Sequence, residues 1–160
     1  MQDNVSGQKP LTILLVESEQ HLIDFLRVGL SFEGFLIENV TCGLEGITRA
    51  QQIKPDVVLT EVLLPDINGL EVCRRLRTML ATQNIPILVL AEQNATPSRE
   101  TMVQAGATSY LEKPFTFDDL LTHIEPLLPA HLATPELRWA AQQDLQGQQI
   151  SGIDIILEQG

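Results

Sequence analysis

Short apolar runs and amphipathic segments alternate along most of the chain. The first run, residues 11–16 (LTILLV), is apolar on both faces and stops at Glu17, which is typical of a strand buried in a parallel sheet. The apolar spacing of three and four over residues 22–30 predicts an amphipathic helix, and Gly34 ends it. A strand followed by a helix is therefore the expected repeating unit.

The same alternation continues for four more units. Further strands are predicted at residues 35–40, 56–61, 85–91 and 108–111, and further helices at about 44–52, 70–80, 96–105 and 117–128. Leu70, Cys73, Leu76 and Leu80 mark the apolar face of the third helix, and Thr116 is the expected N-cap of the fifth. This order predicts an α/β fold, a doubly wound five-stranded parallel sheet with helices on both faces.

Ligands and chemistry in such sheets collect at the carboxyl ends of the strands. That rule selects a small group of polar positions for inspection. They are Glu17, Ser18 and Glu19 after the first strand, Glu61 ending the third, Ala91 and Glu92 after the fourth, and Lys113 after the fifth.

Three regions are expected along the chain. The polar residues 1–10 are predicted to be disordered, residues 11–128 to form the α/β domain, and residues 129–160 to form a C-terminal extension. In the extension we expect a helix at about 135–146, with Pro135 first and Thr134 as its cap, and a strand at about 150–157. Trp139, the only tryptophan, is expected to pack the extension onto the domain or onto a second subunit.

Composition narrows the function classes. The net charge of −11 would repel a phosphate backbone, so we expect no direct nucleic-acid binding from these residues. Cys42 and Cys73 match no metal-ligand spacing and suit a reduced packing role. Because no apolar run approaches the roughly 20 residues of a membrane span, we expect no membrane contact and a cytoplasmic location.

Three segments carry a family resemblance. They are ILLVESE at the first strand, PDVVLTEVLLPDINGLEVCRRLR at the third and AGATSYLEKPF at the fifth. Together they resemble the receiver domain of two-component response regulators, which has a flavodoxin-like fold, over about residues 11–128. The resemblance implies an Asp phosphorylated by a histidine kinase, an acidic pair and a backbone carbonyl holding Mg²⁺, and a Lys that clamps the phosphate. A hydroxyl after the fourth strand and an aromatic residue on the fifth then relay the signal.

This chain departs from that pattern at three positions. Glu61 stands where the family has the phosphorylated Asp, Ser18 replaces one residue of the acidic pair, and Ala91 replaces the switch hydroxyl. The family's Lys and switch aromatic remain as Lys113 and Tyr110. We therefore expect no phosphorylation cycle, no enzymatic activity and weak or lost Mg²⁺ binding. Glu19 and Glu92 could supply a substitute ligand, but solvated loop positions suit them better.

A pair between Glu61 and Lys113 is the expected replacement for the metal. It either imitates a phosphorylated site or is a purely structural ion pair, and the sequence leaves both readings open. The leading hypothesis is an atypical receiver that signals by contact with a protein partner, a histidine kinase or another regulator. The alternatives are a phosphorylatable receiver that still uses Mg²⁺, and the N-terminal part of a longer DNA-binding response regulator.

Two surfaces are candidates for contacts with partners. The face of helix four, strand five and helix five carries Ser109 and no basic residue between positions 115 and 130, so a homodimer there would use apolar contacts around Tyr110, Leu111 and Leu121. The extension is a second candidate for dimerisation. Arg74, Arg75 and Arg77 are expected to form a solvated helix face, or a docking patch for an acidic partner.

Overall fold

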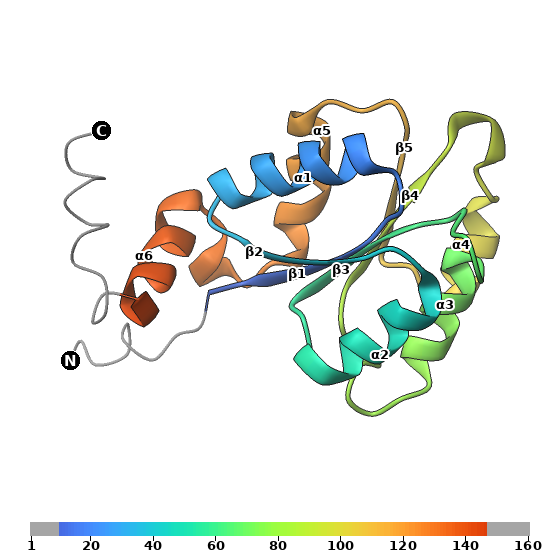
Figure 1. Cartoon of the computed structure of the whole chain (residues 1–160), viewed down its shortest axis with the longest axis horizontal. Coiled ribbons are helices and arrows are strands. Elements are labelled where there is room, and N and C mark those ends of the chain that lie inside the picture. The colour runs from blue at the N-terminus through green and yellow to red at the C-terminus, as the bar shows by residue number, and fades with distance from the viewer. Residues whose placement is uncertain (1–9, 147–160) are drawn as a thin grey trace.

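Five parallel strands form one sheet in the computed structural model, which describes residues 10–146. The strand order is β2-β1-β3-β4-β5, with the helices on both sides of the sheet (Figure 1). The strands are β1 Thr12–Val16, β2 Leu36–Val40, β3 Val57–Glu61, β4 Ile87–Ala91 and β5 Ser109–Glu112; the helices are α1 Gln20–Phe32, α2 Gly43–Ile53, α3 Gly69–Arg77, α4 Arg99–Ala105, α5 Phe117–Ile124 and α6 Pro135–Gln146. The predicted doubly wound α/β fold is confirmed.

Each face of the sheet has its own apolar core. Alternate side chains of the central strands, such as Leu15 and Leu59, pack with α1 and α5. Their neighbours in sequence, such as Leu14 and Val58, pack with α2, α3 and α4 on the other face. Because both faces of β1, β3 and β4 are covered, these strands read as continuous apolar runs.

Several element ends differ from the sequence prediction, most clearly the ends of α3 and α5 and the starts of β4 and α4. Helix α3 ends at Arg77, so the predicted apolar face through Leu80 is wrong, and Leu80 is 89% exposed. The Arg77 guanidinium instead binds the carbonyls of Gln83, Ile85 and Gly106 at 2.7–3.0 Å, which holds the segment before β4 in a loop until Ile87. Helix α5 ends at Ile124, just before Pro126, which lacks the N–H that a continuing helix needs.

The other two arginines of α3 and the cap of α5 match the expectations. Arg74 and Arg75 both bind the carboxylate of Glu71, at 3.2 and 3.0 Å, along a half-exposed helix face. Thr116 Oγ1 accepts the N–H of Asp119 at 3.0 Å, and the Asp119 carboxylate accepts the N–H of Thr116 at 3.0 Å. This reciprocal capping box fixes the start of α5.

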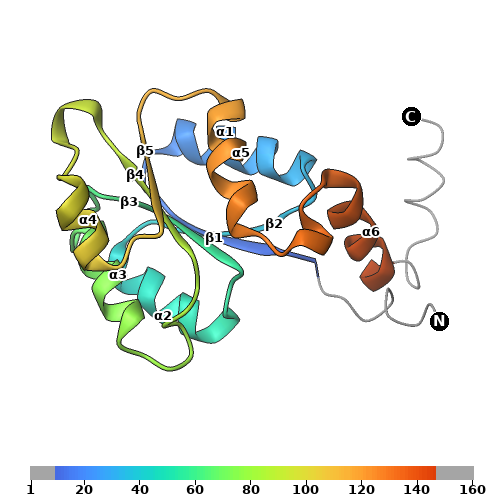
Figure 2. The same ribbon diagram turned by 180° about the vertical axis from the view of Figure 1, so that it is seen from behind.

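The extension begins as predicted and packs onto the domain. Helix α6 starts at Pro135, and Thr134 Oγ1 accepts the N–H of Leu137 at 3.3 Å. The Trp139 indole N–H donates to the carbonyl of Phe32 at 2.9 Å, so this side chain attaches the extension to α1. Both views place α6 beside the start of β2 (Figure 1, Figure 2). The predicted strand at 150–157 and the N-terminal segment before residue 10 lie outside the described residues.

Arg138 is the most deeply buried charged residue of this junction, and its burial was not predicted from the sequence. Its side chain is fully buried and donates to the carbonyls of Glu33, Leu132 and Ala133 at 2.6–3.1 Å. The guanidinium also lies 3.3 Å from the Glu33 carboxylate and 4.3 Å from the centre of the Phe35 ring. These contacts satisfy a charge that would otherwise be costly to bury.

No helix within residues 10–146 is both long and apolar enough to cross a membrane.

Candidate functional site

The polar residues selected from the sequence lie at one edge of the sheet, around Glu61. Glu61 ends β3 and is 3% exposed. The chain then turns back sharply, and the N–H of Gly69 donates to the carbonyl of Val62 at 2.8 Å. A Cβ at Gly69 would collide with the carbonyl oxygen of Glu61. Glycine is therefore required here to let the start of α3 approach the end of β3.

Asp66 braces the same loop from its other side. Its carboxylate accepts the N–H groups of Gly43 and Leu44, at 2.7 and 2.8 Å, at the start of α2. These backbone hydrogen bonds hold the pKa of Asp66 well below its usual range. This role of Asp66 was not predicted from the sequence, because a cap for a helix more than twenty residues away leaves no local pattern.

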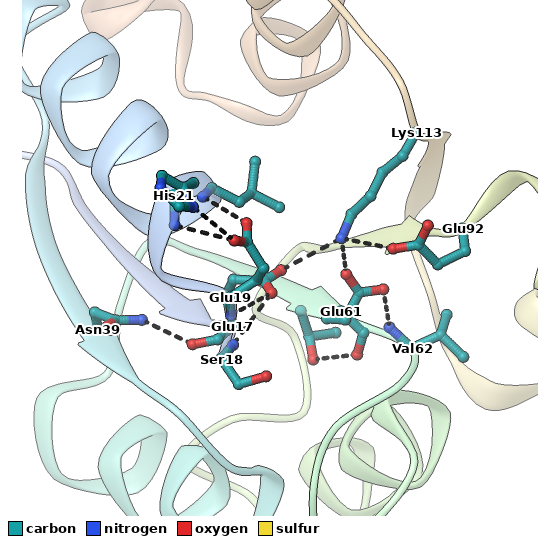
Figure 3. A network of polar contacts seen from close by, with 11 residues as sticks. Glu17, Ser18, Glu19, His21, Asn39, Glu61, Val62, Glu92 and Lys113 are labelled. Carbon is teal, nitrogen blue, oxygen red and sulfur yellow. Dashed lines mark hydrogen bonds and ion pairs between the residues drawn. The ribbon is translucent and has the colours of Figure 1, made fainter.

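Lys113 is the centre of the polar network (Figure 3). Its ammonium group binds the Glu61 carboxylate directly and lies 3.2 Å from Glu92 Oε2 and 3.8 Å from Glu17 Oε1. The structure thus brings the expected Glu61–Lys113 pair together. Burial by itself lowers the pKa of Lys113, but the hydrogen bond to Glu61 and the neighbouring negative charges outweigh it and hold that pKa above its ordinary value. The lysine is a fixed cation.

The second oxygen of Glu61 is also engaged. Oε1 accepts the N–H of Val62 at 3.1 Å, while Oε2 accepts from Lys113. Both carboxylate oxygens therefore have donors from the chain itself. The Glu92 side chain is half-exposed, and its contact with Lys113 was not foreseen from the sequence.

Glu17 is the other buried acid of the site and is 1% exposed. Its Oε2 accepts the N–H groups of Ser18 and Glu19 at 3.1 and 3.0 Å, whereas its Oε1 has no hydrogen-bond partner among the described residues. Burial is the main cause that raises the pKa of Glu17 to about 7, and the adjacent Glu61 contributes. The negative charge of the neighbouring Glu61 therefore disfavours ionisation of Glu17 further.

The neighbours of Glu17 face elsewhere. Ser18 is exposed, and Glu19 caps α1 by accepting the N–H groups of His21 and Leu22 at 3.2 and 2.8 Å. Asn39 on β2 donates to the carbonyls of Leu15 and Val40 at 2.9 and 3.1 Å. The amide of Asn39 thus ties the ends of β1 and β2 together beside the site.

The two switch positions lie toward α4. Ala91 is fully buried at the end of β4, and its carbonyl accepts the N–H of Lys113 at 2.8 Å. Tyr110 is 38% exposed and lines a cavity of about 560 Å³, which Arg99, Met102, Val103 and His123 also line. Ala91 presents only a methyl group to the site, and the Tyr110 ring remains partly in solvent.

Comparison with known proteins agrees with this geometry. The family described as the response regulator receiver domain matches residues 13–125. The response regulator MprA of Mycobacterium sp. (strain KMS) is 37% identical over 119 residues, 74% of this chain and 51% of the relative, and MprA of Mycobacterium leprae (strain TN) is 36% identical over 118 residues, again 74% and 51%. The chain therefore spans about half the length of the curated relatives it matches.

Solved structures give the same result. The chemotaxis response regulator CheY4 of Vibrio cholerae is 26% identical with a TM-score of 0.70, covering 75% of this chain and 100% of that one. The receiver domain of a sensor histidine kinase from Pseudomonas aeruginosa PAO1, solved with a magnesium ion in its active-site cleft, is 26% identical with a TM-score of 0.68, covering 74% and 97%. The five-stranded sheet order, the site at its carboxyl edge and these matches agree: the chain belongs to the response regulator receiver domain family.

Proposed function

We propose that this chain is an atypical receiver, a non-enzymatic cytoplasmic signalling module whose output comes from protein–protein contact and does not depend on phosphorylation. Receivers of its family act with histidine kinases and other regulators in two-component signalling.

The observation that carries the proposal is the direct contact between Lys113 and Glu61. In ordinary receivers, as the resemblance implies, the equivalent lysine clamps the incoming phosphate. Here the ammonium already binds the acid, and the buried Glu61 carboxylate has a donor on each oxygen. The acid that would receive a phosphoryl group is therefore neutralised by the group that would hold it.

The donors around Glu61 do not fit Mg²⁺ well. This ion prefers near-octahedral oxygen coordination, often by one or two carboxylates with several waters. Ser18 offers a neutral, exposed hydroxyl, and the unpartnered Oε1 of Glu17 faces the fixed positive charge of Lys113 at 3.8 Å. Within residues 10–146, no three His, Cys, Asp or Glu side chains are grouped to hold a metal.

The two switch positions support a state that does not switch. Ala91 has no hydroxyl to move toward a phosphate, and Tyr110 stays partly exposed. The ion pair at Glu61 therefore has no polar side chain at position 91 that could relay the state of the site to the rest of the domain. We infer that the Glu61–Lys113 pair is a structural lock and not an imitation of the phosphorylated state.

Phosphorylation chemistry tests the proposal directly. The protein is incubated with Mg²⁺ and acetyl phosphate and weighed intact by mass spectrometry, and we expect no adduct. The combined variant Glu61→Asp, Ser18→Asp and Ala91→Thr restores the family's pattern and should gain one phosphoryl group. Ser18→Asp alone is the matched control and should gain none, because Lys113 still occupies Glu61. A stoichiometric adduct on Glu61 of the parent protein would refute the proposal.

A second candidate rests on the length of the relatives. Because the chain spans 51% of MprA, it could be the receiver portion of a longer DNA-binding response regulator. That candidate requires the gene to continue past Gly160 into a basic, helix-rich segment, which sequencing of the transcript decides. Homodimerisation through the face of α4, β5 and α5 is compatible with both candidates.

A further inference from the structure

An apolar patch lies where α6 meets the end of α1, away from the Glu61 site. It consists of Val28, Phe32 and Trp139, whose exposed fractions are 63%, 77% and 38%. Val28 and Phe32 are four residues apart in α1 and so share one face of that helix. The Trp139 indole N–H is bonded to the Phe32 carbonyl, which places the indole beside Phe32. We call these three residues the α1–α6 patch.

The docked extension adds Trp139 to the two exposed residues of α1. Arg138, Trp139 and Gln142 on α6 donate to the carbonyls of Glu33, Phe32 and Gly34 at 2.6–2.9 Å. Carbonyl groups at the end of a helix have no partners within that helix, so α6 satisfies the end of α1. Since the single polar atom of Trp139 is used in this way, the indole presents an apolar surface to a partner.

The position of the α1–α6 patch separates it from the phosphorylation site. Phe32 ends α1 just before β2 begins at Leu36, whereas Glu61 is the last residue of β3 and Lys113 follows the carboxyl end of β5. In a parallel sheet these are opposite edges. Contact at the patch therefore does not require access to Glu61.

Charge decides which class of partner suits the α1–α6 patch. The chain carries a net charge of −11, and exposed carboxylates flank the patch one helical turn before it, at Asp24 on α1 and Glu136 on α6. Many of the described basic side chains are already paired with carboxylates: Arg49, Arg74, Arg75, Lys113 and Arg138. A second copy, a nucleic acid or an anionic lipid surface would bring more negative charge.

We propose that the α1–α6 patch is a docking surface for a basic amphipathic helix of a partner protein. Apolar side chains on one face of that helix contact Phe32, Val28 and Trp139, and its Lys and Arg residues face the surrounding carboxylates. Aromatic residues are enriched among the side chains that dominate binding at such surfaces, which makes Phe32 and Trp139 the anchors.

Trp139 makes the proposal testable without a known partner, because it is the only tryptophan in the chain. The probe is a synthetic 18-residue helix with leucine on one face and lysine on the other, titrated against the full chain while the Trp139 emission is recorded. We expect a saturable blue shift that weakens in high salt. A peptide of the same composition with the leucines scattered around the helix should bind at least tenfold more weakly.

Substitutions test whether the peptide binds at the α1–α6 patch. Phe32→Ser and Val28→Ser, both at exposed positions, should each weaken binding of the amphipathic peptide about tenfold while leaving the thermal unfolding midpoint unchanged. Leu80→Ser is the matched control, since Leu80 is an exposed leucine that lies after α3, and it should bind as the parent does. The proposal is overturned if Phe32→Ser binds as tightly as the parent, if Trp139 emission does not respond, or if the protein alone sediments as a dimer that Phe32→Ser dissociates. The phosphorylation test above is independent of each outcome.

Discussion

Glu17 should make the protein less stable as pH rises, which is unusual for a carboxylic acid and follows from its burial. Its pKa moves from 4.5 to about 7 in the folded protein. Each pKa unit corresponds to about 1.4 kcal/mol, so full ionisation of Glu17 costs about 3 kcal/mol of folding free energy. The folded pKa is raised, so the stabilisation is complete below pH 4.5 and is lost as pH rises through about 7.

The perturbation that isolates this effect is Glu17→Gln. The amide oxygen of the variant can still accept the N–H groups of Ser18 and Glu19. The variant should match the parent at pH 4.5 and exceed its free energy of unfolding by about 3 kcal/mol at pH 8. The contributions of the other ionisable groups to the pH dependence are common to both proteins and cancel in the difference between their free energies of unfolding.

Urea unfolding at pH 4.5, 6, 7 and 8, followed by Trp139 fluorescence and far-ultraviolet circular dichroism, measures that difference. Glu19→Gln is the matched control with the opposite sign. The Glu19 carboxylate is stabilised by backbone hydrogen bonds at the start of α1, which lower its pKa, so removing its charge should destabilise the protein at neutral pH. A constant difference between Glu17→Gln and the parent from pH 4.5 to 8 would refute the reasoning that Glu17 is held protonated by burial.

Three further substitutions test the packing around the site and the extension. Arg138→Met removes the partner of the carbonyl and the carboxylate of Glu33, so urea unfolding should show a loss of about 3 kcal/mol in the free energy of unfolding. Arg27→Met, at an exposed position, is the control and should change that free energy by less than about 0.5 kcal/mol. Gly69→Ala should destabilise by about 1–3 kcal/mol, because its Cβ meets the backbone of Glu61, and equal stability of variant and parent would contradict that contact. Asp66→Asn should destabilise at pH 7, and the deficit should shrink as pH falls below about 4, because the lowered pKa of Asp66 stabilises the fold only while the carboxylate is ionised.

The sequence was most informative where burial imposes a repeating pattern. The apolar runs of β1, β3 and β4 are fully covered on both faces, so each run marks a strand and the abrupt polar residue after it marks the site. This is why Glu17 and Glu61 could be assigned to one site from the sequence, whereas Lys113 follows the half-exposed strand β5 and was selected only by its position after that strand. The start of α6 was predictable for a different reason, because Thr134 and Pro135 are local capping signals.

What the sequence missed depends on contacts between distant segments. Arg138 looks like an ordinary polar position in a helix, and only the fold reveals that it reaches the carbonyl of Glu33, more than a hundred residues away. The prediction that Leu80 belongs to the buried face of α3 was wrong for the converse reason. Its spacing continues that apolar face, but the helix ends at Arg77. The spacing of apolar residues indicates which face of a helix is buried. It does not indicate where the helix ends when tertiary contacts, such as those of Arg77, decide its end.

The way α6 is fastened also bears on how this surface can change in evolution. Its three anchoring side chains reach oxygen atoms of the main chain at positions 32 to 34, and every amino acid carries that atom. The side chain at position 32 is therefore free to vary without loosening the extension. Homologous chains could exchange Phe32 for another residue and acquire a different binding preference while the scaffold beneath it stays the same.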